Sequence, residues 1–504
     1  MPTDFIDKLT FLSHPSGKAE GKHHIVIVGA GIIGVCTAYY LTKHPDFNPE
    51  THHITVLESK RVAGGASGKA GGLLASWAFP QQIVPLSFQL HQELSDEYNG
   101  DENWDYRRLT TVSLEADVRS IGKRSRGVVA QKRRRRKLRE EFHCSPLSEG
   151  TKKNDGSGGS KNSEDIKANS INENSSRTAN RTRSKTKIDY DGEDLDDEEE
   201  DNEDVETSGD EDEEDDYLDG IGPDVALPSD LNWIKKSLVR DWASLGGTDS
   251  TAQVHPFKFT HFLLSKAMES GAVDLILGKV CRLHCSESGE CTGISYTPTT
   301  DDDSPSNTVV DIKDAQQVVL TMGPWTSKML LDCPISGLRA HSITIKPSTG
   351  TVSPYAIFTE LKIGRNQYFS PEMYARKDEV YICGEGDTLV ELPETSDAVE
   401  VVREKCDELY RYVAKLSNNL SNGHVLKRQA CYLPVLNVPT SSGPLVGETN
   451  VDGLYVASGH SCWGINNAPG TGKVMAELLL EGEAHSADIS ALDPSLYFDA
   501  SILD

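Results

Sequence analysis

Three glycines near the start of the chain, Gly29, Gly31 and Gly34, have the GxGxxG spacing of a turn that binds the phosphates of a dinucleotide. The first permits a tight turn, the second lets the backbone approach a pyrophosphate, and the third lets a helix pack closely on a strand. Glu58, further along, can accept hydrogen bonds from the hydroxyls of a ribose. An acid there favours FAD or NAD over NADP, whose additional phosphate it would repel. The motif leaves FAD and NAD open, and its alternative is a glycine-rich turn that only packs.

A strand, a helix and a second strand must hold these residues, and the surrounding sequence predicts all three. Residues 25–28 are a short apolar run rich in β-branched side chains, which is typical of a buried strand. Residues 35–41 continue as a helix, and residues 54–57 form a second buried strand that ends at Glu58. The start of the helix would present unpaired N–H groups and a positive dipole end to phosphates.

A glycine-rich stretch over residues 61–74 follows the second strand. This composition predicts a loop without regular structure, whose backbone lies against a large ligand and whose Ser67 donates its hydroxyl to phosphate. The alternative is a flexible linker.

Two later strands also run into glycine turns. Residues 317–326 are a buried strand that runs into a turn with Gly323 and Trp325. Residues 453–460 are a strand that ends in glycine, and a turn over 461–472 and a helix over 473–480 follow it. Turns at the carboxyl ends of strands are where α/β sheets bind ligands. The second strand–turn–helix unit therefore suggests a cofactor domain assembled from both ends of the chain.

Composition narrows the class of protein. The formal net charge is −27, and an acidic run over residues 189–219 accounts for most of it. The ten cysteines form no CxxC pair, which argues against zinc and against a disulfide framework. We find no signal peptide and no apolar span of transmembrane length, so we expect a cytoplasmic protein, or one peripheral on a cytosolic membrane face.

Residues 117–220 almost lack apolar periodicity and are predicted to be a disordered insertion. A basic cluster over 132–137 is followed by a polar tract and then by the acidic run. The basic cluster could be a nuclear import signal or a contact for anionic membrane lipid, and the acidic run could fold back on it. The alternative is a solvated loop without a specific role. The longest charge block is acidic, which argues against nucleic-acid binding.

The remaining segments divide as follows: a flexible tail over 1–23, a first cofactor-domain part over 24–116, mixed segments over 221–335, an antiparallel substrate domain over 336–425 and a C-terminal cofactor-domain part over 426–504. Alternating strands at 342–345 and 380–383 predict the antiparallel domain. Residues 231–240 and 395–420 are predicted to be helical.

Several motifs in this order resemble the D-amino-acid-oxidase-like (DAO) family of FAD-dependent oxidoreductases: VIVGAGIIG with Glu58, GGASGKAGGLL, TMGPWT and GLYVASGHSCWGINNAPGTG. The stretches LRAHSITIKP and VYICGEGD are most similar to a fungal branch of the family that is associated with late-endosome recycling. The resemblance implies an α/β fold, with a Rossmann-like FAD-binding domain of the GR2/DAO type and an inserted antiparallel-sheet substrate domain. It also implies FAD rather than NAD, and hydride transfer from the carbon of a small amine to the flavin.

Carried over by position, the resemblance implies a set of cofactor-binding residues. They are Gly29, Gly31, Ile32, Ile33, Gly34, Glu58, Ser67, Gly71, Gly72, Leu73, Val280, Gly323, Trp325, Gly464 and Ile465.

Departures from the family pattern concern the substrate. Leu433 stands where many relatives carry an arginine that clamps an amino-acid carboxylate, and Trp463 stands where sarcosine oxidases have a lysine. Cys431 falls near the position at which sarcosine oxidases tether the flavin, although an isolated cysteine is more often a small buried residue. The catalytic candidates are His460, Trp463, His255 and His341, and a structural role is the commoner one for such histidines.

Two alternatives to a small-amine oxidoreductase remain. One is a flavin fold recruited as an endosomal trafficking or scaffold factor with little or no turnover, acting through a protein or membrane contact of the insertion. The other is an NAD dehydrogenase, in which the C-terminal glycine motif would have no place. No metal site is expected.

Overall fold

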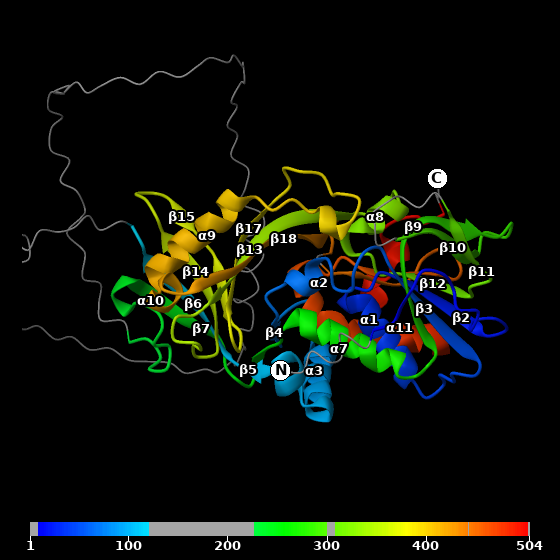
Figure 1. The fold of residues 1–504 in the computed structure, drawn as a ribbon, viewed down its shortest axis with the longest axis horizontal. Coiled ribbons are helices and arrows are strands. Elements are labelled where there is room, and N and C mark those ends of the chain that lie inside the picture. Colours follow the sequence, from blue (N-terminus) through cyan, green and yellow to red (C-terminus); the bar gives the residue numbers. More distant parts are fainter. Residues whose placement is uncertain (1–8, 120–225, 300–307, 442, 502–504) are drawn as a thin grey trace, which may run out of the picture. The chain divides into compact units, whose positions relative to one another are not determined.

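The strand that leads into the GxGxxG turn lies inside a nine-stranded sheet of the computed structural model, which describes residues 9–119, 226–299, 308–441 and 443–501 (Figure 1). β2 (His23–Val28) pairs in parallel with β3 (His52–Glu58) and β12 (Gln317–Leu320). β9 (Val273–Cys285) extends the parallel part beyond β3, and β20 (Leu454–Ser458) extends it beyond β12. Antiparallel strands complete the edges: β10 (Cys291–Pro298), β11 (Val310–Lys313) and β19 (Leu445–Glu448).

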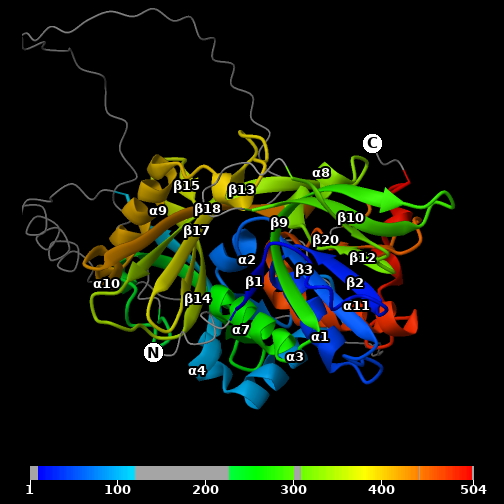
Figure 2. The ribbon, with the colours of Figure 1, turned by 45° about the vertical axis from the view of Figure 1, so that its right-hand side comes forward.

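Alternate side chains of β2 enter two different cores, as expected for a strand buried on both faces. Ile25 and Ile27 pack into a core with the helices α1 (Ile32–Lys43), α7 (Pro256–Met268) and α11 (Gly464–Glu481) (Figure 2). Val26 and Val28 pack on the other face with side chains of β9, β10 and β12. α3 (Val84–Tyr98) and the short α4 (Gly100–Trp104) complete the helical layer. This arrangement holds the turn at residues 29–31 between a rigid strand and a rigid helix.

A second, eight-stranded sheet has the order β18-β13-β17-β16-β14-β6-β7, with β15 paired to β14. Its strands are β18 (His424–Leu436), β13 (Ile335–Lys346), β17 (Val380–Asp387), β16 (Glu372–Ala375), β14 (Tyr355–Lys362), β6 (Thr110–Asp117), β7 (Val239–Gly246) and β15 (Tyr368–Phe369). α9 (Arg403–Leu416) buries one face, and α10 (Asn418–Ser421) follows it. A third, small sheet has the order β4-β8-β5 and consists of β4 (Leu73–Ala75), β8 (Thr251–Gln253) and β5 (Arg107–Arg108).

This second sheet differs from the antiparallel domain predicted over 336–425. β6 and β14 pair in parallel, and β6, β7 and most of β18 come from segments outside that range. Residues 231–240 were predicted to be helical, but they form one 3-10 turn (Lys236–Leu238) and then enter β7. Only Val239 and Arg240 of this range belong to β7, where pairing with β6 outweighs the helical periodicity.

The C-terminal glycines act differently from the prediction. Residues 461–472 were expected to be a turn, but α11 begins at Gly464. A Cβ on Gly472 would lie 2.5 Å from the carbonyl carbon of Cys36 in α1, and a Cβ on Gly470 would lie 2.8 Å from Ile83. These glycines therefore allow close helix packing rather than a turn.

Two shorter segments also differ from the sequence-based expectation. Phe11–Leu12 (β1) pairs with Leu275 and Ile276 of β9, and so it is ordered although residues 1–23 were predicted to be a flexible tail. The glycine-rich loop contains one helical turn, α2 (Ala66–Lys69).

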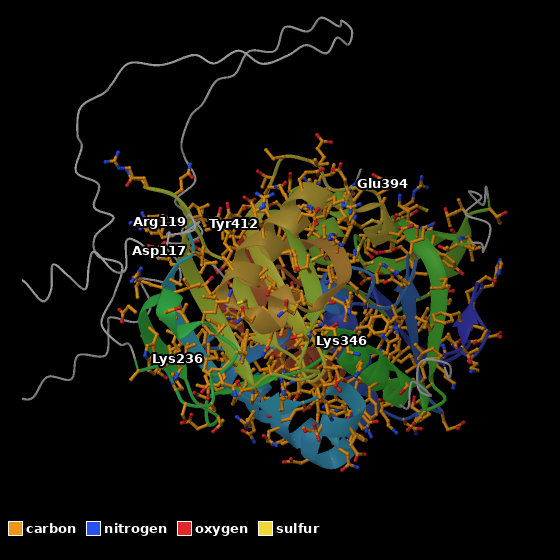
Figure 3. The ribbon with its side chains drawn as sticks, turned by 60° about the vertical axis from the view of Figure 1, so that its left-hand side comes forward. Asp117, Arg119, Lys236, Lys346, Glu394 and Tyr412 are labelled. Atoms are coloured by element: carbon orange, nitrogen blue, oxygen red, sulfur yellow. The ribbon has the colours of Figure 1, made fainter. Side chains whose placement is uncertain are left out.

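Asp117 and Arg119 form an ion pair where β6 ends (Figure 3). Beyond Arg119, the predicted insertion and its charge clusters lie outside the described residues. Among the helices that the structure describes, none has the length and apolar character needed to cross a bilayer.

Candidate active site

A cavity of about 430 Å³ opens at the carboxyl ends of the parallel strands of the first sheet. The wall combines the turn after β2, the end of β3, the start of α2, the middle of β9 and the turns after β12 and β20. Leu433 and Pro434 of β18 also line it, so the cavity reaches the second sheet. In open α/β sheets this edge is where ligands bind.

The motif glycines are closely packed, and a side chain on Gly29 or Gly34 would collide with the backbone. Gly29 has φ +110°, and a Cβ there would lie 2.7 Å from the carbonyl oxygen of Thr321. A Cβ on Gly34 would lie 2.1 Å from the carbonyl oxygen of Gly29, and one on Gly31 would lie 3.1 Å from Ser67 Oγ. The turn is thus a bare backbone surface on the cavity side, which suits a pyrophosphate.

The start of α1 faces this cavity. Its first intrahelical hydrogen bond runs from Val35 N to Gly31 O (3.0 Å), and the cap residue Gly31 provides no side-chain acceptor. Ile32 N donates to Ser67 Oγ (2.9 Å), which brings the Ser67 hydroxyl beside the same turn. Ile32, Ile33 and Ser67 all line the cavity. Amides and a hydroxyl are the groups that bind phosphate oxygens at a helix N-terminus.

Glu58, at the end of β3, is the acid of the cavity on the side of the turn. Its Oε2 accepts a hydrogen bond from Ala30 N (3.0 Å), and its Oε1 accepts from Lys60 N (3.1 Å) and Ser59 Oγ (3.1 Å). Burial raises the pKa of the carboxyl, and these hydrogen bonds oppose the rise. The contacts fix the carboxyl where it can accept from a ribose.

Side chains from three elements cover the cavity near β9 and β12. Trp325 Nε1 donates to Pro393 O (2.7 Å), and Ser458 Oγ donates to Gly323 O (2.8 Å). Glu394, on the loop after β17, pairs with Lys279 (2.5 Å) and with Lys328 (Figure 3). This loop therefore lies across the cavity edge and is held there by ion pairs.

The opposite end of the cavity is formed by the residues that start α11. His460, Ser461, Cys462, Gly464 and Ile465 line it. Cys462 is exposed at this end of the cavity, and the surrounding protein raises the pKa of its thiol, which is therefore neutral.

Comparison with known proteins now decides between the cofactors left open by the motif. Residues 24–153 and 215–478 match the family described as "DAO: FAD dependent oxidoreductase". The chain belongs to this family. It is 58% identical to "Putative oxidoreductase TDA3" of Saccharomyces cerevisiae, with 98% of each chain covered. It is 31% identical to "Putative oxidoreductase C1F5.03c" of Schizosaccharomyces pombe, with 94% of this chain and 98% of that protein covered.

Solved structures support the same fold. The glycine oxidase of Bacillus cereus has a TM-score of 0.56 at 16% identity, and the L-proline dehydrogenase of P. horikoshii has 0.55 at 17%. Each comparison covers 94% of this chain and 97% of the other. The predictions of the DAO family, of FAD as cofactor and of a Rossmann-like domain with a second sheet domain are confirmed.

Most of the residues predicted to bind FAD line the cavity described above. They are Gly29, Gly31, Ile32, Ile33, Glu58, Ser67, Val280, Gly323, Trp325, Gly464 and Ile465. Four others do not line it. Gly34 is under the turn, Gly71 and Gly72 pack against Tyr374 and Val254, and Leu73 is in an apolar cluster. The predicted contacts of all fifteen residues with the cofactor stay predictions.

Of the four catalytic candidates, His460 alone lines the cavity. Its Nε2 lies 3.0 Å from Thr471 Oγ1, and burial lowers its pKa to about 3, so the ring is neutral. His341 Nε2 accepts from Val402 N (3.0 Å), and His255 caps α7 with a pKa lowered by burial to about 2. Trp463 packs edge-on against Trp77 at 5.6 Å between ring centroids. Cys431 is buried and outside the lining, and burial raises its pKa to about 11.

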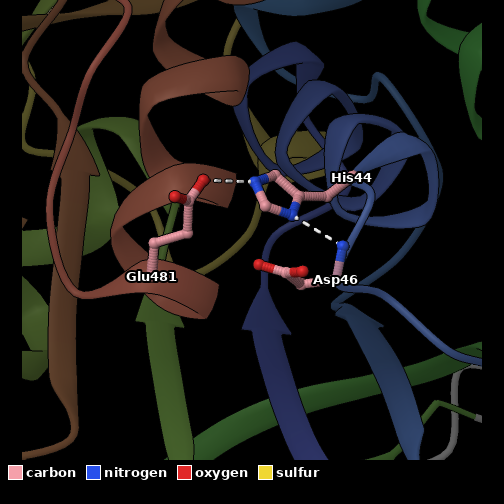
Figure 4. A group of neighbouring side chains, drawn as sticks. All are labelled: His44, Asp46 and Glu481. Atoms are coloured by element: carbon pink, nitrogen blue, oxygen red, sulfur yellow. Dashed lines mark hydrogen bonds and ion pairs between the residues drawn. The ribbon is translucent and has the colours of Figure 1, made fainter.

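One group of side chains has the composition of a metal site. Ligand atoms of His44, Asp46 and Glu481 lie within 4.8 Å of one another (Figure 4). Asp46 N donates to His44 Nδ1 (3.2 Å), and His44 Nε2 lies 2.8 Å from Glu481 Oε1. Both ring nitrogens are therefore used within the protein, and the group joins the end of α1 to the end of α11.

Sequence reasoning missed Glu372 and Tyr374 of β16, which lie near Cys462 at this end of the cavity but outside its lining. No motif marks them, because strand pairing rather than spacing brings them together.

Proposed function

We propose that this protein oxidises a C–N bond of a small amine. FAD, when bound, supplies the acceptor for the hydride that leaves the carbon next to nitrogen. A neutral amine would be oxidised to an imine, which water then hydrolyses. The solved structures with the same fold include an enzyme of proline and an enzyme of glycine, both of which are amines.

The proposal rests on the observation that both sheets contribute to the wall of one cavity. The dinucleotide turn and Glu58 lie at one end, and residues 460–465 and β18 lie at the other. A cofactor held by its phosphates at the first end would extend toward the second sheet. Substrate would then bind between that sheet and the cofactor, at a domain boundary that excludes water.

Several predicted residues receive roles within this proposal. Gly29, Gly31 and the start of α1 would hold the pyrophosphate, and Glu58 would hold the adenosine ribose. Val280 would pair with adenine through its backbone, and Gly464 with Ile465 would cover the pyrimidine edge of the flavin. His460 would serve as a neutral hydrogen-bonding group rather than a proton carrier, because its pKa is far below neutrality.

The test begins with an absorption spectrum of the purified protein, repeated on the supernatant after acid precipitation. We expect a flavin spectrum that moves to the supernatant, because the Cys431 thiol is buried and protonated. Colour that stays in the pellet would point to a covalent tether. Primary and secondary amines are then mixed with the protein without oxygen, and loss of the oxidised flavin band reports hydride transfer. If no amine bleaches the flavin, amine oxidation is wrong.

The comparisons give no support to the trafficking or scaffold alternative. A protein or membrane contact through residues 117–220, a cytoplasmic location and an association with late endosomes stay predictions.

A further inference from the structure

Glu372 is an acid on the face of the second sheet that is turned toward the cofactor domain. It lies in β16, opposite Cys383 of β17, and two residues later Tyr374 lies opposite Tyr381. Residues two apart in a strand share a face, so these four side chains form one patch. The intervening Met373 and Ile382 are buried on the other face, in the core beneath α9.

Only one of the two carboxyl oxygens of Glu372 accepts hydrogen bonds within the described residues. Its Oε2 accepts a hydrogen bond from the Tyr374 hydroxyl and a weak one from the Cys383 thiol (3.7 Å). Within the described residues, Oε1 has no hydrogen-bond partner, and no lysine, arginine or histidine lies within 4.0 Å of the carboxyl. Burial raises the pKa of this group, although the two hydrogen bonds lower it.

Aromatic side chains neighbour Glu372 in the sheet. The rings of Tyr374 and Tyr381 are stacked at 5.8 Å with an interplanar angle of 6°, and the Phe358 ring lies 6.1 Å from that of Tyr374. Phe358 is also the partner of Glu372 in β14. A Cβ on Gly71 would lie 2.1 Å from the Tyr374 ring, so the glycine-rich loop packs directly on this patch.

The patch adjoins the end of the cavity where substrate would bind. Tyr374, Tyr381 and Trp463 belong to one apolar cluster. Cys462 and Gly464, on either side of Trp463, line the cavity. Glu372 contributes to the raised pKa of the Cys462 thiol, in keeping with their proximity.

The positively charged side chains nearby already have partners within the protein. Arg376 pairs with Glu379 (2.6 Å) and donates to the carbonyl oxygens of Ala70 and Gly71. Lys69 donates to Ala430 O (2.9 Å). The lysines of the cavity lining, Lys279 and Lys328, both pair with Glu394.

Glu372 is half-buried and has no cationic partner among the described residues, and partial burial strengthens the attraction of such a carboxylate for a cation. An ammonium group supplies both the charge and the N–H donor for Oε1. A substrate carboxylate, in contrast, would meet the apolar Leu433 in the cavity wall, with Glu372 outside that wall and no free basic group in the described lining.

We propose that Glu372 recognises the ammonium group of the substrate and accepts its proton, which leaves the neutral amine for oxidation, so that the site selects small amines that carry no carboxylate. The inference rests on the proposed amine oxidation and names the substrate class of the same site. Glu372 is a specificity-determining residue in this account.

The test uses the FAD-loaded full chain and tetramethylammonium. This cation has no lone pair on nitrogen and therefore cannot be oxidised to an imine. Binding is followed by perturbation of the flavin absorption bands and by the shift in Tm. The neutral tert-butanol and the anion acetate are the comparison probes. Glu372→Gln keeps the shape and removes the charge, and Glu360→Gln, at an exposed position of β14, is the matched control.

We expect the wild type and Glu360→Gln to bind tetramethylammonium more tightly than either comparison probe. Glu372→Gln should weaken the cation by at least about tenfold and leave tert-butanol unchanged, because a half-buried charge pair loses one partner. If Glu372→Gln does not fold, Glu372→Asp replaces it and should preserve the order of the three probes. Unchanged affinity of Glu372→Gln for the cation, or acetate binding more tightly than the cation, would overturn the inference.

The recognition role of Glu372 and the proposed amine oxidation can fail independently of each other. Flavin bleaching by amines that does not depend on Glu372 would leave amine oxidation standing and remove the recognition role. Cation binding that depends on Glu372, without bleaching by any amine, would do the opposite.

Discussion

The guanidinium of Arg376 donates from Nε to the carbonyl oxygen of Gly71 (3.2 Å), although the two residues are 305 positions apart. The same side chain donates to Ala70 O and pairs with Glu379 (2.6 Å). Only 4% of the Arg376 side chain is exposed. One arginine of the second sheet thus fixes the loop that also places Ser67 beside the dinucleotide turn.

Replacement of this arginine should loosen the loop. Arg376→Ala leaves Glu379 and two carbonyl oxygens without their donor, and breaking such a buried pair costs about 3–5 kcal/mol of the free energy of unfolding. Urea denaturation of the FAD-free protein measures it. The neighbouring Lys377→Ala removes a surface pair with Asp101 and should cost about 1 kcal/mol or less. Equal effects of the two variants would contradict the anchoring role.

The third motif glycine is expected to be intolerant of a methyl group. Gly34→Ala would place Cβ 2.1 Å from Gly29 O and 2.5 Å from Thr321 Oγ1, both of which are fixed by β2 and β12. Overpacking of this kind costs about 1–3 kcal/mol, and the displaced turn should bind FAD more weakly. Flavin content and FAD titration measure the effect. In the control Gly247→Ala, the added Cβ meets only the carboxylate of exposed Asp249, and FAD binding should persist.

The loop after β17 should retard the release of FAD. Glu394 holds it by pairs with Lys279 and Lys328, which lower the pKa of the carboxyl to about 2. Because this pKa is depressed, the pairs persist at all pH values well above 2 and are lost only as the pH falls through it. Both partners are solvent-exposed, so salt should screen the contact. We expect Glu394→Gln to release FAD up to about fivefold faster than wild type and to remove the salt dependence of release, whereas Glu391→Gln on the same loop should do neither.

The sequence sufficed for those parts of the site that lie within one short segment. Gly29, Gly31, Gly34 and Glu58 are positioned by two adjacent strands and the helix between them, and that local pattern fixes their geometry. Motifs at residues 323 and 464 could be added because each directly follows a buried strand. Their convergence required only that parallel strands end at the same edge.

The second sheet could not be derived in this way. Residues 110–117 pair with 355–362, and 239–246 then join the edge, so its membership depends on contacts between distant segments. The patch around Glu372 depends on the register of β16 and β17, which no periodicity in the chain specifies. Histidines were ambiguous for a related reason: His460 faces the cavity and His341 faces Val402, yet both lie beside apolar residues in the sequence.

Acid should destabilise the protein through histidines that are buried in the neutral form. The pKa of His460 is lowered to about 3 and those of His24 and His91 to about 4, against about 6.5 in an unfolded chain. Between these values the unfolded state binds a proton that the folded state does not. The free energy of unfolding therefore falls as the pH falls below about 6.5. Glu58 and Glu372 act in the opposite direction, because burial raises their pKa values and the folded state retains their protons longer.

A single substitution isolates the contribution of His460 to the pH dependence of the free energy of unfolding. His460→Gln can keep a hydrogen bond to Thr471 but has no group that titrates. Between pH 6.5 and 5.0 the free energy of unfolding of the wild type should fall more steeply than that of the variant, and the difference should approach about 1.4 kcal/mol per pH unit. Urea denaturation at four pH values measures both slopes, with His14→Gln at an exposed position as the control that should follow the wild type. Parallel slopes in wild type and His460→Gln would mean that His460 takes up its proton in the folded state, and a proton-carrying role at the cavity would then be open to it.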